Sequence, residues 1–196
     1  SLYRQKDLIG QVGYVNRFND VFIKVKQLLE QGIIGNVVSY RSEMFVPTVI
    51  KTNTESGWRF SREMGGGALF EIASHLIDLT NYFFDCPDKI IGTNLNQVYS
   101  QKIEDIVSST FLYSNKIAGT IYVNWSDESH RKAAINFEIF GAGGKIQADQ
   151  HGFKIYLKQE NKDKNLKKGW TTFYFTDVYK SVPFYVRGND FTRQLY

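Results

Sequence analysis

The sequence predicts an α+β domain built on one mainly antiparallel β-sheet. Two segments carry apolar residues at helical spacing, residues 21–31 and 68–84, and the chain from residue 89 onward consists of short β-rich runs. Turn residues separate these runs, with no long helix between them. Because parallel strands need crossover connections of about a dozen residues or more, the short connections favour antiparallel pairing.

The first predicted helix spans residues 21–31. A β-rich run, residues 11–18, precedes it, and the polar pair Asn19-Asp20 between the two can cap the start of a helix. Gly32 supplies a C-terminal stop.

The first long strand is predicted at residues 36–46. There Val38, Tyr40 and Met44 alternate with polar residues, so one face of the strand is expected to be packed. Further strands are expected at residues 89–98, 106–113, 117–125, 134–140, 144–148, 152–158 and 171–176.

The second predicted helix follows Gly65-Gly66-Gly67 and ends before Pro87. Projected at 100° per residue, its apolar residues occupy two opposite sides, with Phe70 on one of them, so the helix is expected to be largely buried. Its polar residues form a narrow stripe at successive spacings of four, three and four. The members of the stripe are Glu71, His75, Asp78 and Tyr82.

Three interpretations of this stripe remain open. Glu71, His75 and Asp78 could be a solvated or ion-paired face. They could also contribute to a metal site, although a single histidine on one helix would need ligands from elsewhere. The third interpretation is acid–base chemistry, in which a carboxylate one turn away orients His75 and favours its protonated form.

Other candidate residues lie outside that helix. Trp58 and Arg59 could line a pocket with an indole wall and a guanidinium fork, and Arg17 could act similarly, but each also suits surface packing. The glycine cluster Gly141–Gly144 is expected to be a hairpin turn, because β-rich residues follow it where a nucleotide fingerprint requires a helix.

The composition of the chain disfavours nucleic-acid-binding and membrane-spanning proteins. The 196 residues carry a net charge of +4 with acidic and basic residues interspersed, which disfavours nucleic-acid binding. No apolar run is long enough to span a membrane, and the single cysteine, Cys86, favours a reducing compartment, so we expect a cytoplasmic protein with no membrane partner. Its length fits one domain.

Several motifs, taken in order, resemble a known family. The segments GYVNRF, EQGIIGNVVSYRSEM, GWRF, GGGALFEIASHLIDLTNYFF and NFEIFGAGGKIQAD are similar to the C-terminal domain of the glucose-fructose oxidoreductase, inositol dehydrogenase and rhizopine catabolism (Gfo/Idh/MocA) family. The resemblance implies an open, mixed sheet with helices packed on one face and a free face that mediates homo-oligomerisation. It also implies a longer, two-domain enzyme that oxidises or reduces a sugar, cyclitol or related polyol with a nicotinamide cofactor.

Residue by residue, the resemblance implies that His75 is the catalytic histidine and that Glu71 stands where many members have Asp. Arg17, Trp58, Arg59 and Asp78 become candidates for the substrate side, Asp78 also for a supporting structural role. Residues 1–196 would be one substrate-binding and oligomerisation domain, excised from its parent. NAD or NADP would bind to the missing N-terminal domain and not to this chain, so the chain alone would be inactive. The alternative is a non-catalytic sugar-binding or dimerisation module of the same fold.

Overall fold

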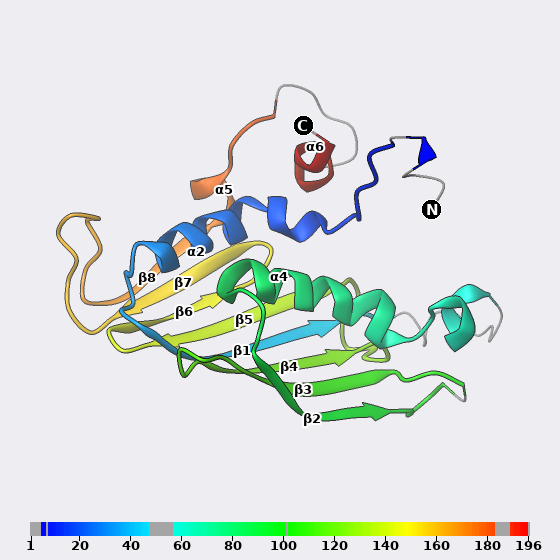
Figure 1. Ribbon diagram of the computed structural model, residues 1–196. Helices are drawn as coiled ribbons and strands as arrows, with labels where there is room; N and C mark the ends of the chain where they lie inside the picture. Colours follow the sequence, from blue (N-terminus) through cyan, green and yellow to red (C-terminus); the bar gives the residue numbers. More distant parts are fainter. Residues whose placement is uncertain (1–4, 7, 48–56, 101, 183–188, 196) are drawn as a thin grey trace.

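The protein folds as one open sheet with its helices on one face. The computed structural model describes residues 5–6, 8–47, 57–100, 102–182 and 189–195. Figure 1 shows helices α2 and α4 lying side by side across the same face of the sheet, and no helix of the described residues covers the opposite face. The expected α+β architecture is confirmed.

The sheet has eight strands in the order β2–β3–β4–β1–β5–β6–β7–β8. The strands are β1 Val37–Phe45, β2 Lys89–Asn96, β3 Ile106–Leu112, β4 Ala118–Asn124, β5 Ala134–Gly141, β6 Gly144–Ala148, β7 Gly152–Leu157 and β8 Gly169–Tyr174. β1 pairs with β4 in parallel, whereas the other neighbouring pairs are antiparallel. The sheet is therefore mixed and mainly antiparallel, as expected.

Eight helical segments connect or cover these strands in the described part of the chain. They are η1 Val15–Phe18, α2 Asp20–Glu30, η2 Trp58–Phe60, η3 Arg62–Met64, η4 Leu69–Ala73, α4 Ser74–Phe84, α5 Phe175–Val178 and α6 Asn189–Leu195. None of them is long and apolar enough to cross a membrane.

The start of α2 differs in part from the prediction. Residues 11–18 do not form a strand, since η1 occupies their second half. The capping prediction is confirmed, because the Asn19 side chain accepts a hydrogen bond of 3.0 Å from the Val21 N–H. A short polar stretch with a capping residue thus enters α2 through a tight turn.

An aromatic cluster joins both long helices to the sheet. Phe22 of α2, Phe83 of α4 and Phe137 of β5 meet edge to face, with ring centroids 5.0 to 6.2 Å apart. Each of these rings is buried. Such pairs add about 0.5–1.5 kcal/mol each beyond the burial of their area, so the cluster fixes how the helices sit on the sheet.

A second core contact sets the C-terminal end of α4. The Tyr40 ring stacks on Phe84 at 4.4 Å and its hydroxyl lies 2.9 Å from that of Tyr113. A Cβ at Gly119 would lie 1.9 Å from the Tyr40 ring, so only glycine lets the ring cross β4. Burial, followed by the Tyr113 hydroxyl, raises the pKa of Tyr40 and keeps it a neutral hydrogen-bonding group.

One residue of β1 departs from the predicted alternation. Tyr40 and Met44 face the core as expected, but Val38 is 55% exposed. The register against β5 shifts between Val37 and Ser39, and this irregularity takes Val38 out of the packed face.

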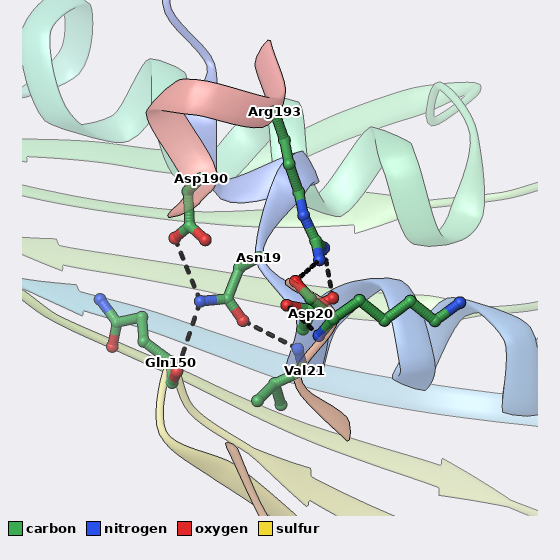
Figure 2. Close-up of polar contacts among 7 residues, drawn as sticks. Asn19, Asp20, Val21, Gln150, Asp190 and Arg193 are labelled. Atoms are coloured by element: carbon green, nitrogen blue, oxygen red, sulfur yellow. Dashed lines mark hydrogen bonds and ion pairs between the residues drawn. The ribbon is translucent and has the colours of Figure 1, made fainter. Parts of the chain in front are cut away.

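The C-terminal helix is fastened to the start of α2 by a cluster that we call the anchor cluster, formed by Asn19, Asp20, Asp190 and Arg193 (Figure 2). Asn19 Nδ2 donates to Asp190 Oδ2 at 3.2 Å and to the Gln150 carbonyl at 3.4 Å. Arg193 forms an ion pair with Asp20, which is 3% exposed. Because α6 also packs against η1, the cluster holds the C-terminal helix against the segment that enters α2.

Candidate functional site

The helix that carries the polar stripe begins against the loop that contains Trp58 and Arg59. The Gly66 N–H donates to the Ser61 carbonyl at 2.9 Å, and the Gly67 N–H donates to the Arg59 carbonyl at 3.1 Å. A Cβ at Gly66 would lie 2.3 Å from the same carbonyl oxygen. The triple glycine therefore permits a close backbone approach that sets Arg59 beside the helix.

The first turns of this helix are wider than predicted. Leu69–Ala73 forms a π-helical segment, η4, and regular α-helix begins only at Ser74. The predicted burial of Phe70 is wrong, since this side chain is 61% exposed. A projection at 100° per residue does not hold through a π turn, which widens the spacing and is frequent at functional sites. Glu71 lies inside the segment.

Glu71 is held by an ion pair on one side and is unpaired on the other. Its Oε1 accepts from Arg59 Nε at 2.7 Å, while its Oε2 is buried with no hydrogen-bond partner in the described protein. The Arg59 guanidinium lies 5.0 Å from the Trp58 ring centroid, and Trp58 is 43% exposed. Arg59 thus places the carboxylate and leaves one oxygen available to a ligand.

His75 lies on the following turn of the helix and is partly buried. Its Nδ1 is buried without a partner in the described protein, and the Tyr14 ring contacts the imidazole edge to face at 5.5 Å. Burial lowers the pKa of His75 and outweighs the opposing effects of Asp78 and Glu71. Asp78 and Glu71 thus favour the protonated form, as the sequence predicts, but burial has the larger effect and the net pKa is lowered.

Arg17 and Asp78 bind each other. Arg17 Nε and Nη2 each lie 2.6 Å from one Asp78 carboxylate oxygen, and Nη2 also donates to the Asp78 carbonyl at 3.3 Å. The hydrogen bond to Asp78 raises the pKa of Arg17. This two-point pair ties η1 to α4 and sets the position of Tyr14 relative to His75.

The structure thus brings the six predicted site residues together along the helix. Arg59 pairs with Glu71, and Arg17 pairs with Asp78. His75 lies between these two pairs, and Trp58 lies against Arg59. Sequence reasoning missed Tyr14 and the buried Glu104, whose Oε1 accepts from the Leu69 N–H at 3.0 Å. Neither residue shares a local spacing with the stripe, so no sequence pattern connected them to it.

The glycine cluster forms the predicted hairpin between β5 and β6. The Ala142 N–H donates to the Asn36 carbonyl and the Gly143 N–H to the Ile34 carbonyl, at 2.9 and 2.7 Å. These donors are committed within the protein and do not present a free nest to a phosphate.

A shallow hollow of about 510 Å³ lies on the helix-free face of the sheet. Arg41, Glu138, Gln147 and Lys154 are among its lining residues, and none of the six predicted site residues is.

The described residues contain no group of three or more His, Cys, Asp or Glu side chains placed to hold a metal ion. The concentration of titratable groups with unused hydrogen-bonding capacity is around His75.

A family model and the sequences of known proteins point to the same family. The family model of the GFO/IDH/MocA C-terminal domain matches residues 22–147. An uncharacterized oxidoreductase of Synechocystis, sll0816, is 25% identical over 173 residues, covering 79% of this chain and 46% of that protein. Levoglucosan dehydrogenase of Pseudarthrobacter phenanthrenivorans is 23% identical over 192 residues, covering 77% of this chain and 49% of that enzyme.

Solved structures share the fold. Levoglucosan dehydrogenase in complex with NADH and levoglucosan superimposes with a TM-score of 0.76 at 22% identity, over 97% of this chain and 55% of that one. WlbA dehydrogenase from Bordetella pertussis, in complex with NADH and UDP-GlcNAcA, gives 0.71 at 18% identity, over 83% of this chain and 48% of that one. The chain spans about half the length of the curated relatives named above. With the matched model, the open mixed sheet and these relatives together, the chain belongs to the Gfo/Idh/MocA oxidoreductase family and corresponds to its C-terminal domain.

Proposed function

We propose that this chain is the substrate-binding domain of a two-domain NAD(P)-dependent oxidoreductase that acts on a sugar, cyclitol or related polyol by hydride transfer. The observation that carries the proposal is the pair of buried, unpartnered atoms Glu71 Oε2 and His75 Nδ1 on neighbouring turns of one helix. Buried polar atoms normally have partners, so two unpaired ones together favour a polar ligand that completes them. A substrate with several hydroxyl groups has the required chemistry.

In this proposal His75 is the general base for a substrate hydroxyl. Burial lowers the pKa of His75, so the imidazole is neutral near pH 7 and able to accept a proton. Glu71, fixed by Arg59 at 2.7 Å, orients the hydroxyl or the imidazole through its second oxygen. A bound nicotinamide would supply the hydride chemistry.

The nicotinamide cofactor belongs to another domain in this proposal. The glycine turn between β5 and β6 is not free to bind a phosphate, since the N–H groups of Ala142 and Gly143 are already bonded to backbone carbonyls. The NADH complexes of the structural neighbours support a nicotinamide cofactor, either NAD or NADP. The isolated chain would then be inactive, and a cytoplasmic location stays a prediction.

The uncovered sheet face supports a second candidate function, a dimerisation or sugar-binding module. Phe140, Trp170 and Tyr174 are 38%, 53% and 65% exposed, which is unusual for large aromatic residues, and they lie on strands at one side of the sheet. We propose that this face pairs with a second copy of the chain in either case. The two candidates differ in whether the parent protein turns over a substrate.

Calorimetric titration of NADH and NADPH into this chain and into a longer protein that includes the preceding domain tests the proposal. Binding by the longer protein alone, followed by oxidation of a member of a polyol panel, is the expected result. Binding by the longer protein without turnover on the panel would favour the module, and binding by this chain alone would contradict the assignment of the cofactor to another domain. Sedimentation of the chain tests pairing separately, because a strict monomer contradicts it.

A further inference from the structure

Glu104 is a buried acid far from the stripe in sequence, yet it contacts the start of the same helix. It lies just before β3 and is 3% exposed. Its Oε1 accepts from the Leu69 N–H at 3.0 Å, and its backbone carbonyl accepts from the Ala68 N–H at 3.1 Å. The first N–H groups of a helix have no partner within the helix, so Glu104 satisfies two of them from another element.

The same carboxylate also fixes the loop that precedes the helix. Arg62 Nη2 donates to Glu104 Oε2 at 3.2 Å. A Cβ at Gly67 would lie 2.3 Å from Glu104 Oε1, and Gly67 has a φ of 103° that side chains other than glycine rarely adopt. The loop, the glycine and the carboxylate therefore fit together in one arrangement.

Gly67, which Glu104 holds in place, is hydrogen-bonded to residues of the stripe and to their partners. The Glu71 N–H, within the wide segment η4, donates to the Gly67 carbonyl at 3.1 Å. Arg59 is bonded to Gly67 through its backbone carbonyl and to Glu71 through its guanidinium. A shift of Gly67 would move both Arg59 and Glu71. It would also move the next turn of the helix, which carries His75.

We infer that Glu104 is a positioning residue for the Glu71–His75 pair, which it places by capping the wide first turn of their helix from outside. The helix has no side-chain cap of its own at this end, and a carboxylate is the group that a helix N-terminus stabilises. The inference rests on the proposed function for its catalytic meaning, but its geometric content concerns this chain alone.

The experiment follows the titration of His75 by NMR in this chain, which requires no substrate and no second domain. Glu104→Ala removes the external cap, so water should reach the imidazole and its titration midpoint should rise toward the ordinary value of a histidine. Glu104→Gln retains an acceptor for the Leu69 N–H and should leave the midpoint near that of the unaltered chain. Gly67→Ala displaces the carboxylate from the other side and should reproduce the effect of Glu104→Ala.

Glu63→Ala is the matched control, because Glu63 is an exposed acid in the adjacent turn η3. It should move neither the His75 midpoint nor the thermal midpoint. If Glu104→Ala and Gly67→Ala lower the thermal midpoint while His75 titrates as before, the role of Glu104 is purely structural and the inference is overturned. Should Glu104→Ala fail to fold, Gly67→Ala decides by the same criterion. The result is independent of whether the longer protein proves to be a dehydrogenase.

Discussion

Two polar clusters lie at the helix layer of this domain, and they differ in how completely their atoms are paired. In the anchor cluster, Asn19 uses both side-chain atoms and Asp20 binds Arg193 together with the Lys180 N–H (Figure 2). In the stripe, Glu71 and His75 each keep a buried atom without a partner in the described protein. Both clusters combine carboxylates with arginine, so composition does not separate them.

The difference separates a polar cluster that joins segments of the chain from one that is able to bind a ligand. A buried polar network with all members satisfied rigidifies the structure, whereas one with unused donors or acceptors costs stability unless a ligand completes it. The anchor cluster accordingly joins segments of the chain, whereas the stripe keeps two buried polar atoms that a ligand could complete. This distinction predicts opposite effects of substitution on stability and on turnover.

The largest expected effect is on turnover in the longer, two-domain protein. His75→Ala should lower kcat by about 10²–10⁴-fold, the usual contribution of a positioned general base, with little change in thermal stability. Steady-state kinetics on the best substrate of the polyol panel measures the effect. His151→Ala, which removes an exposed histidine elsewhere, is the control, and equal kcat values for both variants would refute the role of His75.

The anchor cluster should respond in the opposite way. Asp20→Asn leaves the Arg193 charge, whose side chain is 15% exposed, without its carboxylate, so the free energy of unfolding should fall by about 3 kcal/mol. Urea unfolding measures the loss, and the NMR titration of His75 should be unchanged.

Glu30→Gln is the control, because it breaks the Lys26–Glu30 pair at the exposed Glu30. It should lower the free energy of unfolding by less than about 1 kcal/mol. A shifted His75 titration in Asp20→Asn would show that the two clusters are coupled.

The smallest effect concerns Asp190 and depends on pH. Burial raises the pKa of Asp190. A carboxyl group with a raised pKa binds more protons in the folded state than in the unfolded state, so its contribution to stability declines as pH rises from the unfolded pKa through the folded one. Asp190→Asn keeps an acceptor for Asn19 and removes this decline, which should raise Tm at pH 7 above that of the unaltered chain.

The two proteins should converge in Tm as the pH falls below the ordinary pKa of an aspartate, where both side chains are neutral. Asp163→Asn in the exposed loop after β7 is the control and should leave Tm unchanged at either pH. A lower Tm for Asp190→Asn at pH 7 would mean that the charged carboxylate stabilises the anchor cluster.

Local patterns in the sequence predicted most of the fold, because alternation, turn residues and capping act over a few positions. They predicted α2, β1, the hairpin at Gly141–Gly144 and the sheet type. They did not predict η1 or the wide turn at Glu71, since a π segment has the same residue types as a regular helix.

For the candidate site, spacing alone gathered Glu71, His75 and Asp78 on one stripe. It did not supply their partners, because Arg17 lies 61 positions from Asp78 and Glu104 lies 35 positions from Leu69. The larger effect of burial on the pKa of His75 could not be predicted either, because burial depends on side chains such as Tyr14 that only the tertiary structure brings to the imidazole.

The place of β1 in the sheet has a consequence for how the domain is made. This strand is the first of the eight along the chain, but its two neighbours, β4 and β5, end at Asn124 and Gly141. Contacts between such distant segments form late because of the entropy of closing the loop between them, while hairpins such as β3–β4 and β5–β6 close locally. During synthesis on the ribosome, we therefore expect the hairpins to form first, with the position between β4 and β5 still unoccupied. The sheet becomes continuous only when β1, from the earlier part of the chain, pairs with both strands.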